Sequence, residues 1–268
     1  MHLTFVGGGN MTTAMIGGLT KEEMPLVIQV VDHNPDKLTQ LVKKFGIVPL
    51  SSLPECFSSY DIVILAVKPQ NLKDVSTALR KKLNGALVVT VAAGINTQTL
   101  SRWLNTTRIV RVMPNTPAMI GKGISGLYAS AGLRESDRQR VDVIMSAVGS
   151  IIWLDNEEKI DDITCLSGSG PAYVFYFIES MLEAAQQIGF DPVSARQVVL
   201  ATFEGAIELA KISEGTIAQL RSHVTSKGGA TERAIARFEQ DGVKPIIIAG
   251  IKDCHARAIE MGQKLSQE

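Results

Sequence analysis

The sequence contains few cysteines, and none of them is close to another. Cys56, Cys165 and Cys254 are the three cysteines of the 268 residues, and no Cys-x-x-Cys pair occurs. An odd number of widely spaced cysteines argues against a disulfide framework and against a structural zinc site. The four histidines also lack the spacing of metal ligands. We therefore expect no metal site and a reducing, cytoplasmic compartment.

Neither sign of charge is in excess. The 27 Lys and Arg residues balance 27 Asp and Glu residues, which gives a formal net charge of zero at pH 7. This balance argues against the broad basic surface that non-specific nucleic-acid binding requires and against an acidic, disordered chain. The longest apolar run, Gly85 to Ile95, is too short to span a bilayer, and the N-terminus lacks a signal-peptide pattern. We expect a soluble, unprocessed protein without a nucleic-acid or membrane partner.

The first half of the chain alternates short apolar runs with segments of helical spacing. Helical segments are expected at 34–46, from an Asn-Pro pair to a glycine, and at 71–83. Further strands at 121–130 and 151–154 are expected as antiparallel additions at the sheet edge. Five apolar runs have the length of strands that are buried on both faces: Leu3–Val6, Leu26–Val31, Ile62–Val67, Leu87–Val91 and Ile109–Met113. This order predicts a doubly wound α/β domain with a mostly parallel sheet.

The pattern changes after about Asp155, where helical periodicity replaces the strands. We predict two domains: residues 1–155 form a dinucleotide-binding Rossmann domain, and residues 156–268 form an all-helical domain. Aromatic residues gather at 173–177 in one expected helix that is apolar all round. A helix of this character favours burial against a second subunit as well as its own.

A glycine-rich turn follows the first strand and opens a helix. In a dinucleotide site the first glycine permits the tight turn, the second lets the backbone approach the pyrophosphate, and the helix N-terminus offers free N–H groups. Gly7 and Gly9 occupy these positions, whereas Thr12 stands where a third small residue is usual. An ordinary strand-to-helix turn is the alternative. The context favours cofactor binding by Gly7, Gly8, Gly9, Asn10 and Met11.

The residues after the second strand point to two different cofactors. Asp32 could bind ribose hydroxyls and so favour NAD. His33, Asn34 and Lys37 could instead hold the extra phosphate of NADP at the start of the next helix. Asn34 is also expected to cap that helix. The two signals conflict, and both cofactors remain open.

Two later strand ends supply further cofactor candidates. One follows the strand at 62–67, at the carboxyl edge where ligands bind in such sheets. The other is a stiff loop bracketed by prolines, which suits a wall of the nicotinamide pocket. The alternatives are that Lys68 is only an exposed loop lysine and that the proline-bracketed loop is only a structural turn. The candidates at these ends are Ala66, Val67, Lys68, Pro69, Pro114 and Asn115.

The most specific stretch is VTSKGGATERAI, residues 224–235. Its two glycines precede a helix start, which exposes backbone N–H groups that a small carboxylate could occupy. Thr231, in the first turn of that helix, would place a hydroxyl beside the anion. A helix-to-helix turn capped by Ser226 or Thr231 is the alternative.

Five ordered blocks resemble pyrroline-5-carboxylate reductases over essentially the whole chain: GGGNMTTAM, AVKP, RVMPNTPAMIGKG, SGSGPAYVFYFIES and VTSKGGATERAI. The resemblance implies a Rossmann domain and a helical dimerisation domain that interlocks with its partner in a homodimer or a multiple of dimers. It also implies reduction of 1-pyrroline-5-carboxylate to L-proline, the final step of proline biosynthesis. The implied cofactor is NADPH, while Asp32 keeps NADH open.

The same resemblance assigns roles around the last block. Thr231 matches a hydroxyl near the ring nitrogen of the substrate and is the catalytic candidate. The implied substrate-binding residues are Glu214, Val224, Ser226, Gly228, Gly229, Ala230 and Thr231. Two other functions stay open: a β-hydroxyacid dehydrogenase, although its catalytic lysine is missing from the first long helix of the second domain, and a non-catalytic NADP-binding sensor.

Overall fold

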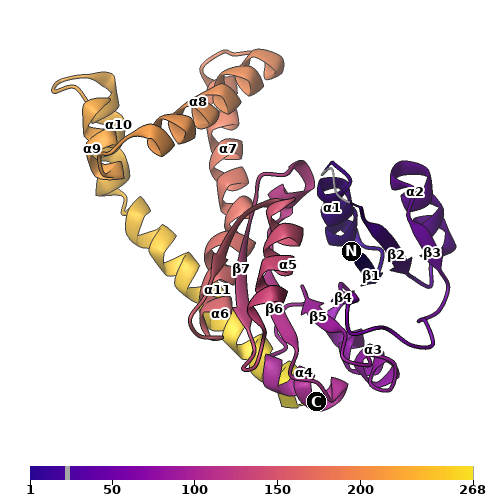
Figure 1. Cartoon of the computed structure of the whole chain (residues 1–268). Helices are drawn as coiled ribbons and strands as arrows, with labels where there is room; N and C mark the ends of the chain where they lie inside the picture. Colours follow the sequence, from indigo (N-terminus) through magenta and orange to yellow (C-terminus); the bar gives the residue numbers. More distant parts are fainter. Residues whose placement is uncertain (22–24, 268) are drawn as a thin grey trace. The chain divides into compact units, whose positions relative to one another are not determined.

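One eight-stranded sheet organises the first part of the chain (Figure 1). The computed structural model describes residues 1–21 and 25–267. The strands lie in the order β3-β2-β1-β4-β5-β6-β7-β8. Their bounds are β1 His2–Val6, β2 Val27–Val31, β3 Val48–Leu50, β4 Ile62–Leu65, β5 Leu87–Thr90, β6 Ile109–Met113, β7 Gly123–Ala129 and β8 Gly149–Trp153.

The sheet has the strand order of a Rossmann domain, extended at one edge. Strands β1 to β6 pair in parallel, β7 pairs antiparallel with β6, and β8 pairs parallel with β7. The order 3-2-1-4-5-6 is that of the dinucleotide-binding fold. The predicted strands are confirmed, and so is the predicted antiparallel direction of the last two strands at the sheet edge. Strand β3 was not predicted, because three residues around Pro49 at a sheet edge give no periodic signal.

Helices cover both faces of this sheet. Helices α1, α2 and α5 contribute to one buried cluster with alternate residues of β1 and β4, and α3 and α4 contribute to a second cluster on the opposite face. Burial on both faces explains why the strands are continuously apolar. The bounds are α1 Asn10–Leu19, α2 Pro35–Phe45, α3 Leu72–Leu79, α4 Thr97–Leu104, α5 Glu135–Ser146 and α6 Lys159–Ile163. Two short 3₁₀ helices are η1 Pro69–Asn71 and η2 Thr116–Ile120, and η3 Thr164–Gly168 is a short π-helix.

The rest of the chain is helical, as predicted. Its helices are α7 Gly170–Gln187, α8 Pro192–Ile212, α9 Ile217–His223, α10 Ala230–Gln240 and α11 Val243–Gln267. The chain divides into two compact units: residues 1–171 together with the chain from Cys254 onward, and Ala172–Asp253. The predicted functional boundary after residue 155 stays a prediction. None of the described helices is both long and apolar enough to cross a membrane.

The second unit buries very little of its own apolar surface. Among its described residues, Ala195 and Val199 are the buried ones, whereas Phe175 is 65% and Ile212 is 80% exposed. Helices α9 and α10 contain no buried residue. Since burial of apolar surface is the main term that stabilises a fold, this unit requires another surface to cover it.

A buried ion pair ties the start of β6 to α5. The Arg108 guanidinium donates to both carboxylate oxygens of Asp137, at 2.7 and 2.5 Å, and also to the carbonyls of Ser59 and Gly85. The Asp137 side chain is 1% exposed. The hydrogen bonds from Arg108 outweigh burial and hold the pKa of Asp137 below its usual value. The pair therefore contributes stability only while Asp137 is ionised.

We expect Asp137→Asn to lower the free energy of unfolding by about 3–5 kcal/mol at pH 7, because it leaves a partly buried guanidinium without its charge partner. The folded-state pKa is below the unfolded value of about 4, so the full contribution is present above that pH and is lost as pH falls through the folded-state pKa. In urea denaturation at equal protein concentration, the difference in the free energy of unfolding between wild type and Asp137→Asn should become smaller at acidic pH. Asp155→Asn, which removes one partner of the exposed Lys159 pair, should leave the midpoint nearly unchanged. Equal midpoints for wild type and Asp137→Asn at pH 7 would contradict this role.

Candidate functional site

The strand order reverses between β1 and β4, and ligands in such sheets bind outside the carboxyl ends of the strands at this point. The residues that follow these two strands are Gly7 and Ala66, and the Ala66 N–H donates to the Val6 carbonyl at 2.9 Å. The predicted glycine-rich turn therefore lies beside the predicted loop at Ala66–Pro69.

Only glycine fits at position 7, because the backbone there lies close to the Ala66 carbonyl. Its φ is +105°, and a Cβ at this position would lie 2.6 Å from the Ala66 carbonyl oxygen. Thr12 is fully buried, and its hydroxyl donates to the Gly7 carbonyl at 2.6 Å. The departure from a small third residue thus supplies a hydrogen bond that closes the turn.

Gly9 leaves space above the start of α1. It is the N-cap residue, no side chain caps the helix, and a Cβ here would meet no heavy atom within 4 Å. Asn10 and Met11 are the first two helical residues, so the unpaired N–H groups of the first turn face an open cradle. A pyrophosphate fits these donors.

Asp32 connects this turn to the loop before α2. Its Oδ2 accepts the Gly8 N–H at 2.7 Å, and its Oδ1 accepts the Asn34 N–H at 2.8 Å. Burial alone would raise the pKa of Asp32, but the N–H groups of Asn34 and Gly8 and the charge of Lys37 together lower it. His33, Asn34 and Lys37 are exposed around the start of α2.

Asn34 also forms the predicted cap of α2. Its side-chain oxygen accepts the N–H groups of Asp36 at 2.9 Å and Lys37 at 3.2 Å. The start of α2 is therefore capped, whereas the start of α1 is not.

The other cofactor candidates follow β4 and β6. Val67 and Pro69 are half-buried and Lys68 is exposed. Pro114 and Asn115 are buried. The Asn115 amide accepts the Ile124 N–H at 3.0 Å and donates to the Ser167 carbonyl at 3.2 Å, so both ends of this side chain are held within the fold.

Most substrate candidates gather in the turn between α9 and α10. Val224 follows α9 as its C-cap, and Gly229 precedes α10 without a side-chain cap. Ala230 and Thr231 are the first residues of α10, and both are exposed. Within this turn, Gly228 has φ +73° and donates to the Glu232 carboxylate at 2.7 Å. The Gly229 N–H donates to the Ser226 carbonyl at 3.0 Å.

Glu214 is exposed and lies at the opposite end of α9, in the loop after α8. The substrate candidates and the cofactor candidates belong to different compact units.

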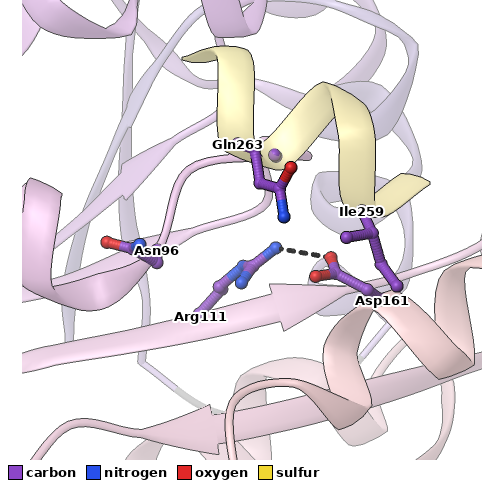
Figure 2. Close-up of a pocket in the computed structure, with 7 residues that line it drawn as sticks. Asn96, Arg111, Asp161, Ile259 and Gln263 are labelled. Atoms are coloured by element: carbon purple, nitrogen blue, oxygen red, sulfur yellow. Dashed lines mark hydrogen bonds and ion pairs between the residues drawn. The ribbon is translucent and has the colours of Figure 1, made fainter. Parts of the chain in front are cut away.

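A cavity of about 340 Å³ around Arg111 was not predicted from the sequence (Figure 2). Its central residue is Arg111, which is 3% exposed and donates to Glu157 and Asp161 at 3.2 Å each. Glu157 also accepts the N–H and hydroxyl of Thr97, both at 2.7 Å. Burial raises the pKa of Asp161 despite the nearby Arg111. The lining residues are Gly94, Asn96, Arg111, Asp161, Ile259, Gly262 and Gln263.

This arrangement is a structural junction, because one guanidinium is shared by two carboxylates and joins β6 to the segments around α4 and α6. An arginine in the middle of an apolar strand was the available sequence signal. In the part of the chain that the structure describes, no group of three His, Cys, Asp or Glu side chains could hold a metal ion.

Two families match separate parts of the chain. Residues 2–94 match the family described as NADP oxidoreductase coenzyme F420-dependent. Residues 157–261 match the family described as pyrroline-5-carboxylate reductase dimerisation. The helical region thus matches a dimerisation domain, and the glycine-rich turn falls in the NADP oxidoreductase match.

Relatives that match along nearly their whole length are named pyrroline-5-carboxylate reductase. The pyrroline-5-carboxylate reductase of Pseudomonas aeruginosa is 37% identical over 99% of this chain and 98% of its own length. That of Vibrio alginolyticus is 36% identical over 97% of both chains. The solved structure of a pyrroline-5-carboxylate reductase from Coxiella burnetii has a TM-score of 0.88 at 35% identity and covers 97% of both chains. The pyrroline carboxylate reductase of Plasmodium falciparum with NADP bound has a TM-score of 0.86 at 26% identity over 98% of both chains. This chain therefore belongs to the pyrroline-5-carboxylate reductase family.

Proposed function

We propose that the protein reduces 1-pyrroline-5-carboxylate to L-proline with NAD(P)H, as the final step of proline biosynthesis. The observation that carries this function is the match to curated pyrroline-5-carboxylate reductases along nearly the whole chain. The match favours a reductase over a β-hydroxyacid dehydrogenase and over a non-catalytic sensor. The bound nicotinamide supplies a hydride to the carbon of the C=N bond, and the ring nitrogen gains a proton, so the products are proline and NAD(P)⁺.

The direct test mixes the purified protein with 1-pyrroline-5-carboxylate and NADPH or NADH. Loss of absorbance of the reduced cofactor with matching formation of proline is expected. No consumption of a cofactor that is shown to bind would favour the sensor.

We assign cofactor binding to residues 1–155. The uncapped first turn of α1 would hold the pyrophosphate, with Gly9 leaving room and Asn10 and Met11 donating N–H groups. The loop at Ala66–Pro69 and the backbone at Pro114 and Asn115 would form neighbouring walls at the carboxyl edge of the sheet.

We assign substrate binding and dimerisation to residues 156–268. The uncapped start of α10 would hold the substrate carboxylate, because Gly229 brings no side chain to the N–H groups of Ala230 and Thr231. Hydride transfer is easier to the protonated imine, and the Thr231 hydroxyl could hold that N–H. Since the imine can take its proton from solvent, no strongly titrating acid is required. The chain then contributes mainly positioning and electrostatics.

The biological unit in this proposal is a homodimer or a multiple of dimers. The exposed apolar surface of the second unit, which includes Phe175 and Ile212, needs a cover, and the dimerisation-family match supports a second copy. The proposal includes a cytoplasmic location, which the three free cysteines support. It includes no nucleic-acid partner, which the zero net charge supports.

Gly9→Ser tests the cofactor cradle. Serine is a good N-cap residue and its Cβ meets no atom, so the melting temperature should be unchanged or higher. Its hydroxyl would take the N–H groups proposed for the pyrophosphate, and the cofactor dissociation constant should rise about tenfold or more, equivalent to ~1.4 kcal/mol. Fluorescence titration with reduced cofactor measures the effect. Unchanged affinity would refute the placement of the pyrophosphate.

Thr231→Ala tests the proposed hydroxyl contact. Turnover should fall about tenfold or more, with cofactor affinity nearly unchanged, because the ring N–H loses its acceptor. Thr231→Ser should restore most of the turnover. Thr202→Ala is the matched control, since the Thr202 hydroxyl donates to the Val198 carbonyl of its own helix. Wild-type turnover in Thr231→Ala would exclude the assigned role.

Light scattering after size-exclusion chromatography tests the assembly. At micromolar concentration the mass should be twice 28.9 kDa or an even multiple of it. Phe175→Glu places a charge on the surface proposed to be covered and should weaken self-association about tenfold or more. Gln40→Glu, on α2, adds the same charge to an exposed position of the first unit and should not weaken it. A monomeric wild-type protein would disprove the dimer.

A further inference from the structure

We infer that Asp32, together with the capped start of α2, makes this protein select NADH over NADPH. The inference rests on the proposed function, in which the reductase uses one of the two cofactors. The cofactors differ by a phosphate on the adenosine ribose, and the loop between β2 and α2 is the part of a Rossmann domain that meets this ribose. The contacts of that loop therefore decide the preference.

The Asp32 carboxylate is held in place at this loop. One oxygen accepts the Gly8 N–H at 2.7 Å from the glycine-rich turn, and the other accepts the Asn34 N–H at 2.8 Å. The side chain is 14% exposed. Because each carboxylate oxygen has two acceptor positions, an ionised Asp32 can still accept hydrogen bonds from ribose hydroxyls. A fixed carboxylate is thus suited to the hydroxyls that NADH has at this place.

The helix that follows offers no free site for a phosphate. An anion at a helix start is bound by unpaired N–H groups of the first turn. In α2 the N–H groups of Asp36 and Lys37 already donate to the Asn34 side chain. The start of α2 therefore differs from the uncapped start of α1, and a phosphate there would have to displace Asn34.

The charges around the loop also oppose the extra phosphate group of NADPH. Lys37 is the cation nearest to Asp32 among the contacts of the described residues, with Nζ 3.9 Å from Oδ2, so its charge is partly neutralised. Residues 25–45 contain no arginine, the side chain that binds phosphate in a bidentate manner. A phosphate would add about two negative charges beside the Asp32 carboxylate. Within residues 32–37, Lys37 and the exposed His33 are the side chains that can oppose this repulsion, and Lys37 already pairs with Asp32.

The experiment measures dissociation constants for NADH and NADPH by cofactor fluorescence, without substrate, in the wild type and in variants. We expect the wild type to bind NADH about tenfold or more tightly than NADPH. Asp32→Asn keeps one acceptor oxygen and removes the charge, so the ratio should move about tenfold towards NADPH. The matched control, Asp36→Asn, removes a charge from the same loop without a contact to the glycine-rich turn, and should change the ratio less than about twofold.

His33→Arg keeps the Asp32 contacts and protects the test against poor folding of Asp32→Asn. It adds a phosphate-binding cation at an exposed position and should tighten NADPH alone. A wild type that prefers NADPH, or an equal shift in Asp36→Asn, would overturn the inference.

The ratio of kcat/KM for the two cofactors separates this inference from the proposed function. Tight NADH binding without reduction of 1-pyrroline-5-carboxylate would refute the function and leave the selectivity standing. Reduction with NADPH in preference to NADH would refute the selectivity and leave the function standing. Absence of binding by both cofactors would refute both.

Discussion

The contact between Gly7 and Ala66 is the constraint on which the cofactor end of the molecule depends. It brings the turn after β1 against the end of β4, where the strand order reverses. The Thr12 hydroxyl closes the turn from one side, and the Asp32 carboxylate holds it from the other through the Gly8 N–H. These three contacts all involve Gly7 or Gly8, and together they fix the position of the uncapped N-terminus of α1.

Local signals in the sequence predicted most of this region. The apolar runs, the Asn34 cap, the Gly46 stop and the glycine-rich turn each depend on neighbours within a few residues, and spacing reveals such dependence. The Arg111 network joins residues 46 and 50 positions apart, so no spacing rule could pair them. The role of Thr12 was also hidden, because the consensus describes the size of the third residue and not its hydrogen bond.

Of the two conflicting cofactor signals after β2, Asp32 favoured NAD, and His33, Asn34 and Lys37 favoured NADP. Asn34 was also expected to cap α2, and its side-chain oxygen accepts the Asp36 and Lys37 N–H groups. Only the contacts of its side-chain oxygen distinguish the cap from the phosphate ligand. The zero net charge, which argued against a nucleic-acid partner, has a related explanation: anion sites built from backbone N–H groups at helix starts require no surplus of lysine or arginine.

The cap on α2 has a consequence for how such enzymes diverge. A helix start can act as an anion receptor or be closed to anions, and a single side-chain oxygen makes the difference here. The start of α2 can be capped or left open without any change in the sheet or in the helical unit. In the proposed assignment, a few substitutions within residues 32–37 are enough to redirect cofactor use, while the turn between α9 and α10 that is proposed to bind the substrate stays unchanged.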